Sequence, residues 1–171
     1  MKTLIIYYSY EGNCEAISKT IQEETGADVL RIEPKKEKKT KSLFRFVWGG
    51  MQVYMTKKPE LKQYKINLNE YDTIFIGSPV WFGTYAPPIN TFLSENEIKN
   101  KNIGIFICSG NNKRNTFTNF EKALKGNNII GEIEFVYPIK NGIESARQNA
   151  RKWVKECISK ISKKSNHKAD S

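Results

Sequence analysis

Apolar residues in this chain gather in short runs, which are separated by polar turns rich in glycine, asparagine and proline. Residues 3–8, 71–77 and 103–108 are runs of β-branched and aromatic residues, which is typical of strands buried on both faces of a parallel sheet. Residues 28–32 and 132–137 alternate apolar and polar positions, so they predict more exposed strands of the same sheet.

Between these runs, the apolar positions follow helical spacing. Helices are expected over residues 13–26, from Pro87 onward and around residues 116–124. Glycine at position 26 suits a helix C-terminus, and proline suits the first turn of a helix. The longest apolar stripe, residues 143–161, predicts a final amphipathic helix.

The role of the segment from residue 35 to residue 65 is the hardest to interpret. Aromatic and apolar residues over 44–55 fall at helical spacing, but Gly49-Gly50 interrupts them. We expect a bent crossover helix whose aromatic side chains pack on the sheet, because a stripe at this spacing is usually core. Contact with a ligand is the alternative.

Strand and helix alternate five times along the chain. This predicts an α/β fold, a doubly wound five-stranded parallel sheet with helices on both faces. A length of 171 residues suits a single domain. We assign residues 1–162 to that domain and expect residues 163–171 to be a disordered, basic polar tail.

The formal net charge is +10, and much of it lies in residues 35–41 and 147–168. A solvated basic surface is the plainer explanation and the one we favour. A patch for an acidic partner, a nucleotide phosphate or nucleic acid is the sharper alternative, although we do not expect nucleic acid binding.

The small numbers of cysteine and histidine residues argue against several kinds of site. The three cysteines are widely spaced and the single histidine is His167, so we expect no disulfide framework, no metal site and no Ser-His or Cys-His catalysis. A strand-like run follows Met1-Lys2 directly, and no apolar run approaches the ~20 residues of a membrane-spanning helix. We therefore expect no signal peptide, no membrane contact and a cytoplasmic location.

Ligands of open α/β sheets bind beyond the carboxyl ends of the strands, so the loops there are the candidate site. The first strand leads into Ser9-Tyr10-Glu11-Gly12-Asn13-Cys14, where a helix begins. Free N–H groups at a helix start favour an anion, whereas an ordinary N-cap formed by Ser9 or Asn13 is the alternative. With one glycine, this loop matches neither the G-x-G-x-x-G dinucleotide motif nor a P-loop.

Two further loops follow the third and fourth predicted strands. Pro79-Val80-Trp81-Phe82-Gly83 places aromatic side chains in a stiff loop, where we expect them to cover something flat and apolar. Packing on a neighbouring helix or a partner chain is the alternative. Ser109-Gly110-Asn111-Asn112 suits the turning of backbone amides toward a ligand, and equally suits a surface turn.

These loops resemble those of the flavodoxin family, and the resemblance extends to about residue 160. The first loop of the family commonly reads S-x-T-G-N-T. Ser9, Gly12 and Asn13 match that pattern, while glutamate and cysteine replace the two threonines. The stretch 77–84 resembles the second flavin loop and is the most specific match, and 109–112 aligns loosely with the third.

The resemblance implies a flavodoxin-like three-layer sandwich with strand order 2-1-3-4-5 and non-covalently bound FMN. The ring of the flavin is expected between the second and third loops, against Trp81 or Phe82. The expected cofactor-binding residues are Ser9, Tyr10, Glu11, Gly12, Asn13, Cys14, Pro79, Val80, Trp81, Phe82, Gly83, Ser109, Gly110, Asn111 and Asn112. Glu11 is expected to bind through its backbone, and no side chain is expected to be catalytic.

An FMN-binding electron-transfer protein is the function we favour on this resemblance. Electron carriers of the family are typically acidic, whereas this chain has a pI near 9.4, which implies an acidic redox partner. An NAD(P)H-dependent quinone or flavin reductase on the same fold is the alternative, with Lys113 and Arg114 near a nucleotide phosphate. A flavin-free protein that binds an acidic partner or nucleic acid ranks third.

Cys14 carries a separate prediction. A helix N-terminus lowers the pKa of a thiol, so we expect Cys14 to be reactive when no flavin covers it. A buried, inert side chain is the alternative.

Overall fold

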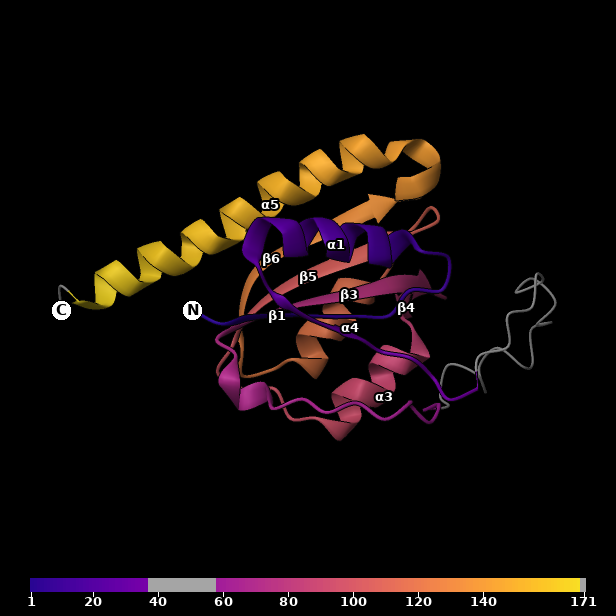
Figure 1. The fold of residues 1–171 in the computed structure, drawn as a ribbon, viewed down its shortest axis with the longest axis horizontal. Helices are drawn as coiled ribbons and strands as arrows, with labels where there is room; N and C mark the ends of the chain where they lie inside the picture. Colours follow the sequence, from indigo (N-terminus) through magenta and orange to yellow (C-terminus); the bar gives the residue numbers. More distant parts are fainter. Residues whose placement is uncertain (37–57, 170–171) are drawn as a thin grey trace.

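The computed structural model describes residues 1–36 and 58–169, with side chains as far as Lys164. The bent helix expected over residues 44–55 lies outside these ranges. Strands and helices alternate along the described chain (Figure 1). They are β1 (Thr3–Tyr7), α1 (Asn13–Thr25), β2 (Asp28–Arg31), a short 3-10 helix (Leu68–Glu70), β3 (Thr73–Trp81), β4 (Thr84–Tyr85), α3 (Pro87–Glu95), β5 (Asn102–Ser109), α4 (Thr116–Ala123), β6 (Asn128–Val136) and α5 (Pro138–Ala169).

The strands form one twisted sheet in the order β2-β1-β3-β5-β6, and each of these neighbouring pairs is parallel. The predicted order 2-1-3-4-5 is therefore confirmed. The two-residue strand β4 is an addition, which pairs antiparallel with the end of β3 through Val80–Tyr85 and Trp81–Thr84.

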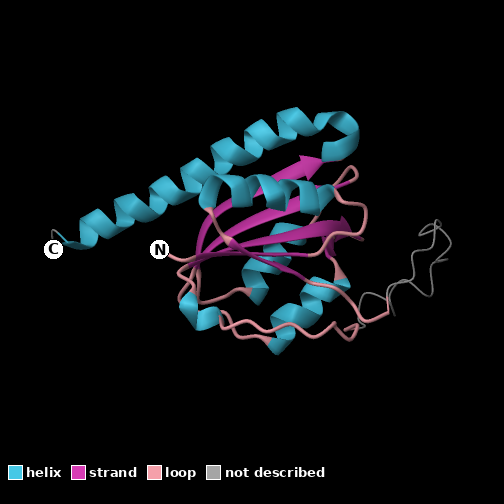
Figure 2. Cartoon of the chain, viewed as in Figure 1, coloured by secondary structure: helices cyan, strands magenta, loops and turns pink. Residues whose placement is uncertain are grey.

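Helices cover both faces of the sheet, as Figure 2 shows. Helices α1 and α5 lie side by side on one face, while α3 and α4 lie on the other (Figure 1). Each face has its own apolar core. Ile17 and Trp153 belong to the core under α1 and α5, and Ile89 and Phe120 to the core under α3 and α4. The predicted three-layer sandwich is thus present.

Element boundaries differ from the expected ones at three places. The third strand continues past Gly77 to Trp81, into the stretch predicted to be a loop. The last parallel strand begins at Asn128, with an irregular register beside Ile103/Gly104. Helix α5 begins at Pro138, has non-helical backbone at Gly142 and continues to Ala169, past residue 161 where the predicted apolar stripe ends.

The described residues contain neither a helix suited to cross a membrane nor a cluster suited to bind a metal ion. Their helices offer no stretch with the length and apolar character required to cross a bilayer. Their His, Cys, Asp and Glu side chains form no group of three or more that is placed to hold a metal ion.

Candidate functional site

The first loop leaves the start of α1 without a side-chain cap. Gly12 is the N-cap residue with φ 86°, a left-handed conformation that suits glycine, and no side chain hydrogen-bonds to the cap. The first helical bond runs from the Ala16 N–H to the Gly12 carbonyl at 2.9 Å. Asn13 instead accepts a bond from the Ile139 N–H at 3.3 Å. Ordinary capping by Ser9 or Asn13, the alternative in the sequence, is therefore absent.

Ser9 is the second unusual feature of this loop. Its side chain is 3% exposed, and its hydroxyl oxygen has no hydrogen-bond partner among the described residues. A buried hydroxyl without a partner costs about 1–3 kcal/mol. Ser18, Thr73 and Trp153 hold the other such atoms of the described residues, and of the four only Ser9 lies in a loop at the carboxyl edge of the sheet. The hydroxyl stands at the entry to a helix start with free N–H groups, and this donor set suits a phosphate.

Arg31 at the end of β2 is a site residue that sequence reasoning missed. Its Nη2 lies 3.5 Å from the Ser9 carbonyl oxygen, and its Nη1 lies 3.0 Å from the Glu15 carboxylate in the first turn of α1. Its Nε also lies 3.7 Å from Glu33. Arg31 thus places a positive charge beside the first loop and offsets Glu15. The signal available in the sequence was its position at the carboxyl end of a strand expected to neighbour the first.

The second predicted loop is mostly a β-hairpin, which corrects our expectation of an irregular loop. Strand β3 runs through Pro79 and Val80 to Trp81, Phe82 and Gly83 form the turn, and β4 follows. Both turn residues have positive φ, 53° at Phe82 and 83° at Gly83. That geometry matches a tight hairpin turn, whose twist fits the strands on either side.

Trp81 and Phe82 play different roles in this hairpin. The Trp81 ring packs edge-on against Tyr8 and Tyr10, with centroids 5.7 Å and 5.9 Å away. It therefore joins the second loop to the first. Phe82 is 49% exposed, which makes it the aromatic side chain of the hairpin that is open to a ligand.

The third loop begins inside β5. The Ser109 hydroxyl donates to Glu134 at 2.6 Å, so it is already paired. Asn111 and Asn112 are exposed, and the Asn112 side-chain oxygen accepts a bond from the Arg114 N–H at 2.8 Å. Arg114 has φ 40° and packs against the second loop, since a Cβ added at Gly83 would lie 2.6 Å from its Cδ.

The connection from β6 to α5 also reaches this edge, although no sequence pattern predicts that it belongs to the site. A Cβ at Gly110 would lie 2.5 Å from the Tyr137 hydroxyl oxygen, and one at Gly12 would lie 3.6 Å from Ile139 Cδ1. Tyr137 is 41% exposed and Ile139 49%. These side chains bridge the first and third loops, so the three predicted loops form one continuous edge.

The family model described as Flavodoxin matches residues 2–157. The chain belongs to the flavodoxin family. Among solved structures, a putative flavoprotein from Bacteroides eggerthii is similar at 23% identity and TM-score 0.72, over 90% of this chain and 96% of that one.

Two further structures are similar. A flavoprotein from Lactobacillus acidophilus, solved in complex with FMN, is 25% identical with TM-score 0.65, over 82% of this chain and 97% of that one. Oxidised flavodoxin 2 from Bacillus cereus is 20% identical with TM-score 0.59, over 94% and 99% of the two chains. The fold is thus that of flavodoxins and flavoproteins.

Cys14 departs from the flavodoxin first-loop pattern, and our expectation of a reactive thiol is wrong. Its side chain is 1% exposed and belongs to the core between α1 and the sheet. Burial raises the pKa of the Cys14 thiol well above its usual value, and the neighbouring Cys108 raises it further. Loss of hydration outweighs the helix dipole here, because the side chain points into the core rather than out of the helix start. Only the backbone of Cys14 remains for a ligand.

Basic side chains surround the flavodoxin-type loops. Lys113 lies over the Phe117 ring at 5.3 Å, and Lys140 lies over the Tyr137 ring at 5.5 Å. Both lysines and Arg114 are exposed at the carboxyl edge of the sheet, as is the acidic Glu11. Three exposed cations therefore gather at the second and third loops and the start of α5, whereas the first loop and the start of α1 carry the acidic Glu11 and Glu15.

Proposed function

We propose that this protein binds FMN at the carboxyl edge of its sheet and works as an electron carrier. The observation that carries the proposal is the buried Ser9 hydroxyl, which lacks a partner beside a helix start that no side chain caps. Family membership and the FMN complex of a 25% identical flavoprotein support the same ligand.

The residues of the first loop would hold the phosphate. Ser9 would donate its hydroxyl, and the backbone N–H groups of Gly12, Asn13 and Cys14 would donate toward the same anion. Glu11 is exposed, so its side chain would stay in water while its N–H takes part. Arg31 would donate to the Ser9 carbonyl and pair with the Glu15 carboxylate in the first turn of α1.

The exposed Phe82 ring and the turn at Gly110 would flank the flavin ring. FMN supplies the redox chemistry when it is bound, and the protein orients it and sets its electrostatic surroundings. The remaining predicted contacts, at Tyr10, Pro79, Val80, Trp81, Gly83, Ser109, Asn111 and Asn112, belong to this proposal. Trp81 already packs on tyrosines, so we assign it to supporting the first loop rather than to stacking.

The exposed cations at the second and third loops support an acidic redox partner. Lys113, Arg114 and Lys140 are exposed around the proposed flavin site, so they would attract a negatively charged protein surface. The three cysteines are free thiols, which suits a reducing compartment, and we place the protein in the cytoplasm.

An NAD(P)H-dependent reductase is the second candidate. Arg114 lies against Gly83 in the hairpin, so a cation stands beside the turn that would flank the flavin ring. That position suits contact with the phosphates of a nicotinamide nucleotide. A flavin-free binding protein is the third candidate and is favoured only if FMN does not bind.

Absorption spectra of the purified protein test these candidates. We expect FMN to bind tightly on titration and to give a flavin spectrum that persists anaerobically when NADH or NADPH is added alone. Bleaching by either nucleotide within seconds would instead establish the reductase. Absence of FMN binding would overturn both flavin functions.

A further inference from the structure

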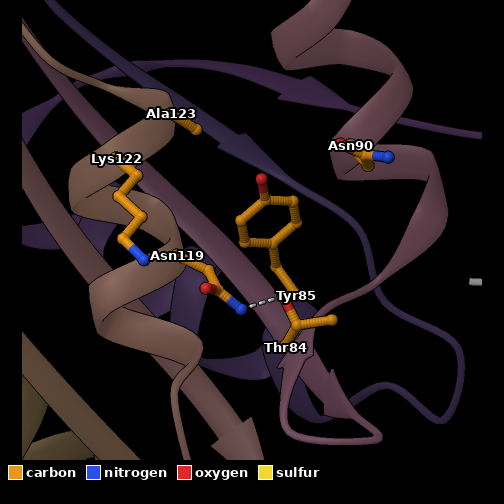
Figure 3. Close-up of a pocket in the computed structure, with 6 residues that line it drawn as sticks. All are labelled: Thr84, Tyr85, Asn90, Asn119, Lys122 and Ala123. Carbon is orange, nitrogen blue, oxygen red and sulfur yellow. Dashed lines mark hydrogen bonds between the residues drawn. The ribbon is translucent and has the colours of Figure 1, made fainter. Parts of the chain in front are cut away.

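A cleft opens between α3 and α4, on the face of the sheet opposite α1 and α5. Its volume is about 440 Å³, within the range of ~300–1,000 Å³ that small-molecule sites occupy. Figure 3 shows its lining, with the Tyr85 ring standing between the two helices. The lining residues are Thr84, Tyr85, Asn90, Asn119, Lys122 and Ala123. Thr84 ends the stretch that resembles the second flavin loop and pairs with Trp81, while the other five lining residues lie outside the proposed FMN site.

Helix α4 supplies the charged wall of the cleft. Asn119, Lys122 and Ala123 lie three and four positions apart, so they share one face of the helix. Glu121 lies on another face, where its charge contributes to a raised pKa of Glu132 on β6, after desolvation. The acidic side chain of α4 is therefore directed away from the cleft, and the lining contains no carboxylate.

Several hydrogen-bonding groups in the cleft are available to a ligand. The Asn119 amide donates to the Thr84 hydroxyl oxygen at 2.9 Å, which leaves the Thr84 hydrogen free to donate elsewhere. Within the described chain, Lys122 forms no ion pair, and the Asn90 side-chain amide and the Tyr85 hydroxyl have no hydrogen-bond partner, although the Asn90 backbone N–H donates to the Ala86 carbonyl. Burial raises the pKa of Tyr85, so its hydroxyl stays protonated at neutral pH.

An aromatic wall adds an apolar surface to these donors. The Tyr85 ring packs against Phe120, with centroids 4.5 Å apart, and this pairing fixes its orientation. The Ala123 methyl lies on the α4 side of the same cleft (Figure 3). The first turn of α3 cannot bind an anion in the usual way, because Pro87 and Pro88 have no N–H. Charge recognition therefore falls to Lys122.

We propose that this cleft binds a small aromatic carboxylate. The Lys122 ammonium would pair with the carboxylate, the Tyr85 and Ala123 side chains would contact the ring, and the two asparagine amides would bind polar ring substituents. Uncompensated positive charge selects an anion, and the aromatic wall selects a ring over an inorganic ion. The site is independent of the proposed FMN function.

Calorimetric titration tests the proposal, with benzoate as the probe and excess FMN present so that the flavin site is filled. We expect benzoate to bind with a dissociation constant of about 1 mM or tighter. Benzamide, which has the ring without the charge, and acetate, which has the charge without the ring, should each bind at least about tenfold more weakly. Benzoate should also shift the NMR signals of Thr84 and Asn119.

Lys122→Met should weaken benzoate binding by about tenfold or more, because it removes the cation and keeps a similar length. Lys125→Met is the matched control, since Lys125 is exposed and does not line the cleft. Tyr85→Phe should weaken binding by a few-fold while it keeps the ring. No benzoate binding, or equal binding by the Lys122 and Lys125 variants, would overturn the proposal whether or not FMN binds.

Discussion

Loops at the two edges of the sheet differ in their side-chain hydrogen bonds and in their backbone conformation. At the amino edge, the Asn127 amide donates to the carbonyls of Ile98 at 2.7 Å and Leu124 at 2.8 Å, and its oxygen accepts from the Lys101 N–H at 3.0 Å. At the carboxyl edge, the Ser9 hydroxyl is buried without a partner in the described chain.

Backbone strain follows the same division. Phe82, Arg114 and Tyr137 at the carboxyl edge have φ of 53°, 40° and 41°. Such conformations are rare for bulky residues and each costs roughly 1–3 kcal/mol. At the amino edge, Asn100 has φ 57°, which asparagine tolerates well. The buried, unpaired Thr73 hydroxyl is an exception at that edge.

This difference indicates that the amino edge stabilises the fold and that the carboxyl edge binds a ligand. Paired loops at the amino edge hold the strand starts in register and stabilise the fold. Strained residues and the unpaired Ser9 hydroxyl at the carboxyl edge cost stability, and Ser9 remains as a donor for a ligand. Substitutions at the two edges should therefore change different measurements, and each prediction below tests that separation.

The largest expected effect is on stability, from Asn127→Ala at the amino edge. Loss of its three side-chain hydrogen bonds removes the Asn127 partner of the Ile98 carbonyl and of the Lys101 N–H, so the free energy of unfolding should fall by about 2–3 kcal/mol. Urea denaturation of the FMN-free protein measures this. Asn141→Ala, which removes one exposed bond to the Val136 carbonyl, is the control and should cost less than about 0.5 kcal/mol. A parallel fall in FMN affinity would show that the edges are not independent.

Ser9→Ala should weaken FMN binding without lowering the stability of the FMN-free protein. FMN affinity should fall by about tenfold, because a charge-assisted hydrogen bond to the phosphate is lost. Riboflavin, which lacks the phosphate, should bind as before, and the FMN-free variant should be at least as stable as the wild type. Fluorescence titration measures both affinities. Ser18→Ala removes another buried, unpaired hydroxyl of α1 and should leave FMN binding unchanged; equal losses in the two variants would contradict the phosphate role.

Tyr71→Phe probes the amino edge through pH. The Tyr71 hydroxyl donates to Asp28 at 2.9 Å, and burial, followed by Asp28, raises its pKa above 10.0. Because the folded pKa is higher than the unfolded one, the stabilisation by the protonated hydroxyl is complete below the unfolded pKa. It is lost as the pH rises from there through the folded pKa. The variant should be about 1 kcal/mol less stable at pH 7, and this deficit should shrink above about pH 10. Thermal unfolding across pH measures it, and a deficit that does not change with pH would exclude this titration.

Arg31→Gln should have the smallest effect. Glu15 loses its partner at the helix start and repels a phosphate, so FMN affinity should fall about threefold at low salt. The loss should fade at high salt, because Arg31 and Glu15 are exposed. Riboflavin affinity should not change. Arg147→Gln, which breaks a similar exposed pair with Glu144, is the control. A salt-independent loss would mean that Arg31 acts through the Ser9 carbonyl alone.

Prediction from sequence succeeded where a pattern is local. Alternation of strand and helix signals gave the layers, and Gly12 marked the turn before α1 correctly. The stretch ending at Trp81 was assigned to a loop because its proline and glycine suggest one. In the structure, Pro79 pairs in register with Cys108, so the strand continues. Pairing with β5 is a long-range property that the local pattern does not contain.

The candidate site was predicted less completely for the same reason. Arg31 and Ile139 reach the first loop from elements far along the chain, and only the packing brings them there. Cys14 was assigned by its place at a helix start, yet its direction into the core decides its pKa. Residues 37–57 lie outside the described ranges, so the interpretation of that segment stays a prediction.

The order of elements, the strand order implied by the family resemblance and the loops that meet at the carboxyl edge can all be predicted from the amino-acid sequence. These follow from hydrophobic periodicity and from glycine and proline positions, which act over a few residues. Packing in three dimensions leaves the Ser9 hydroxyl without a partner among the described residues, buries Cys14 and leaves a cleft lined by Tyr85 between α3 and α4. Partners, burial and cavities depend on which distant residues pack together, because solvent exclusion and hydrogen bonding are properties of neighbours in space.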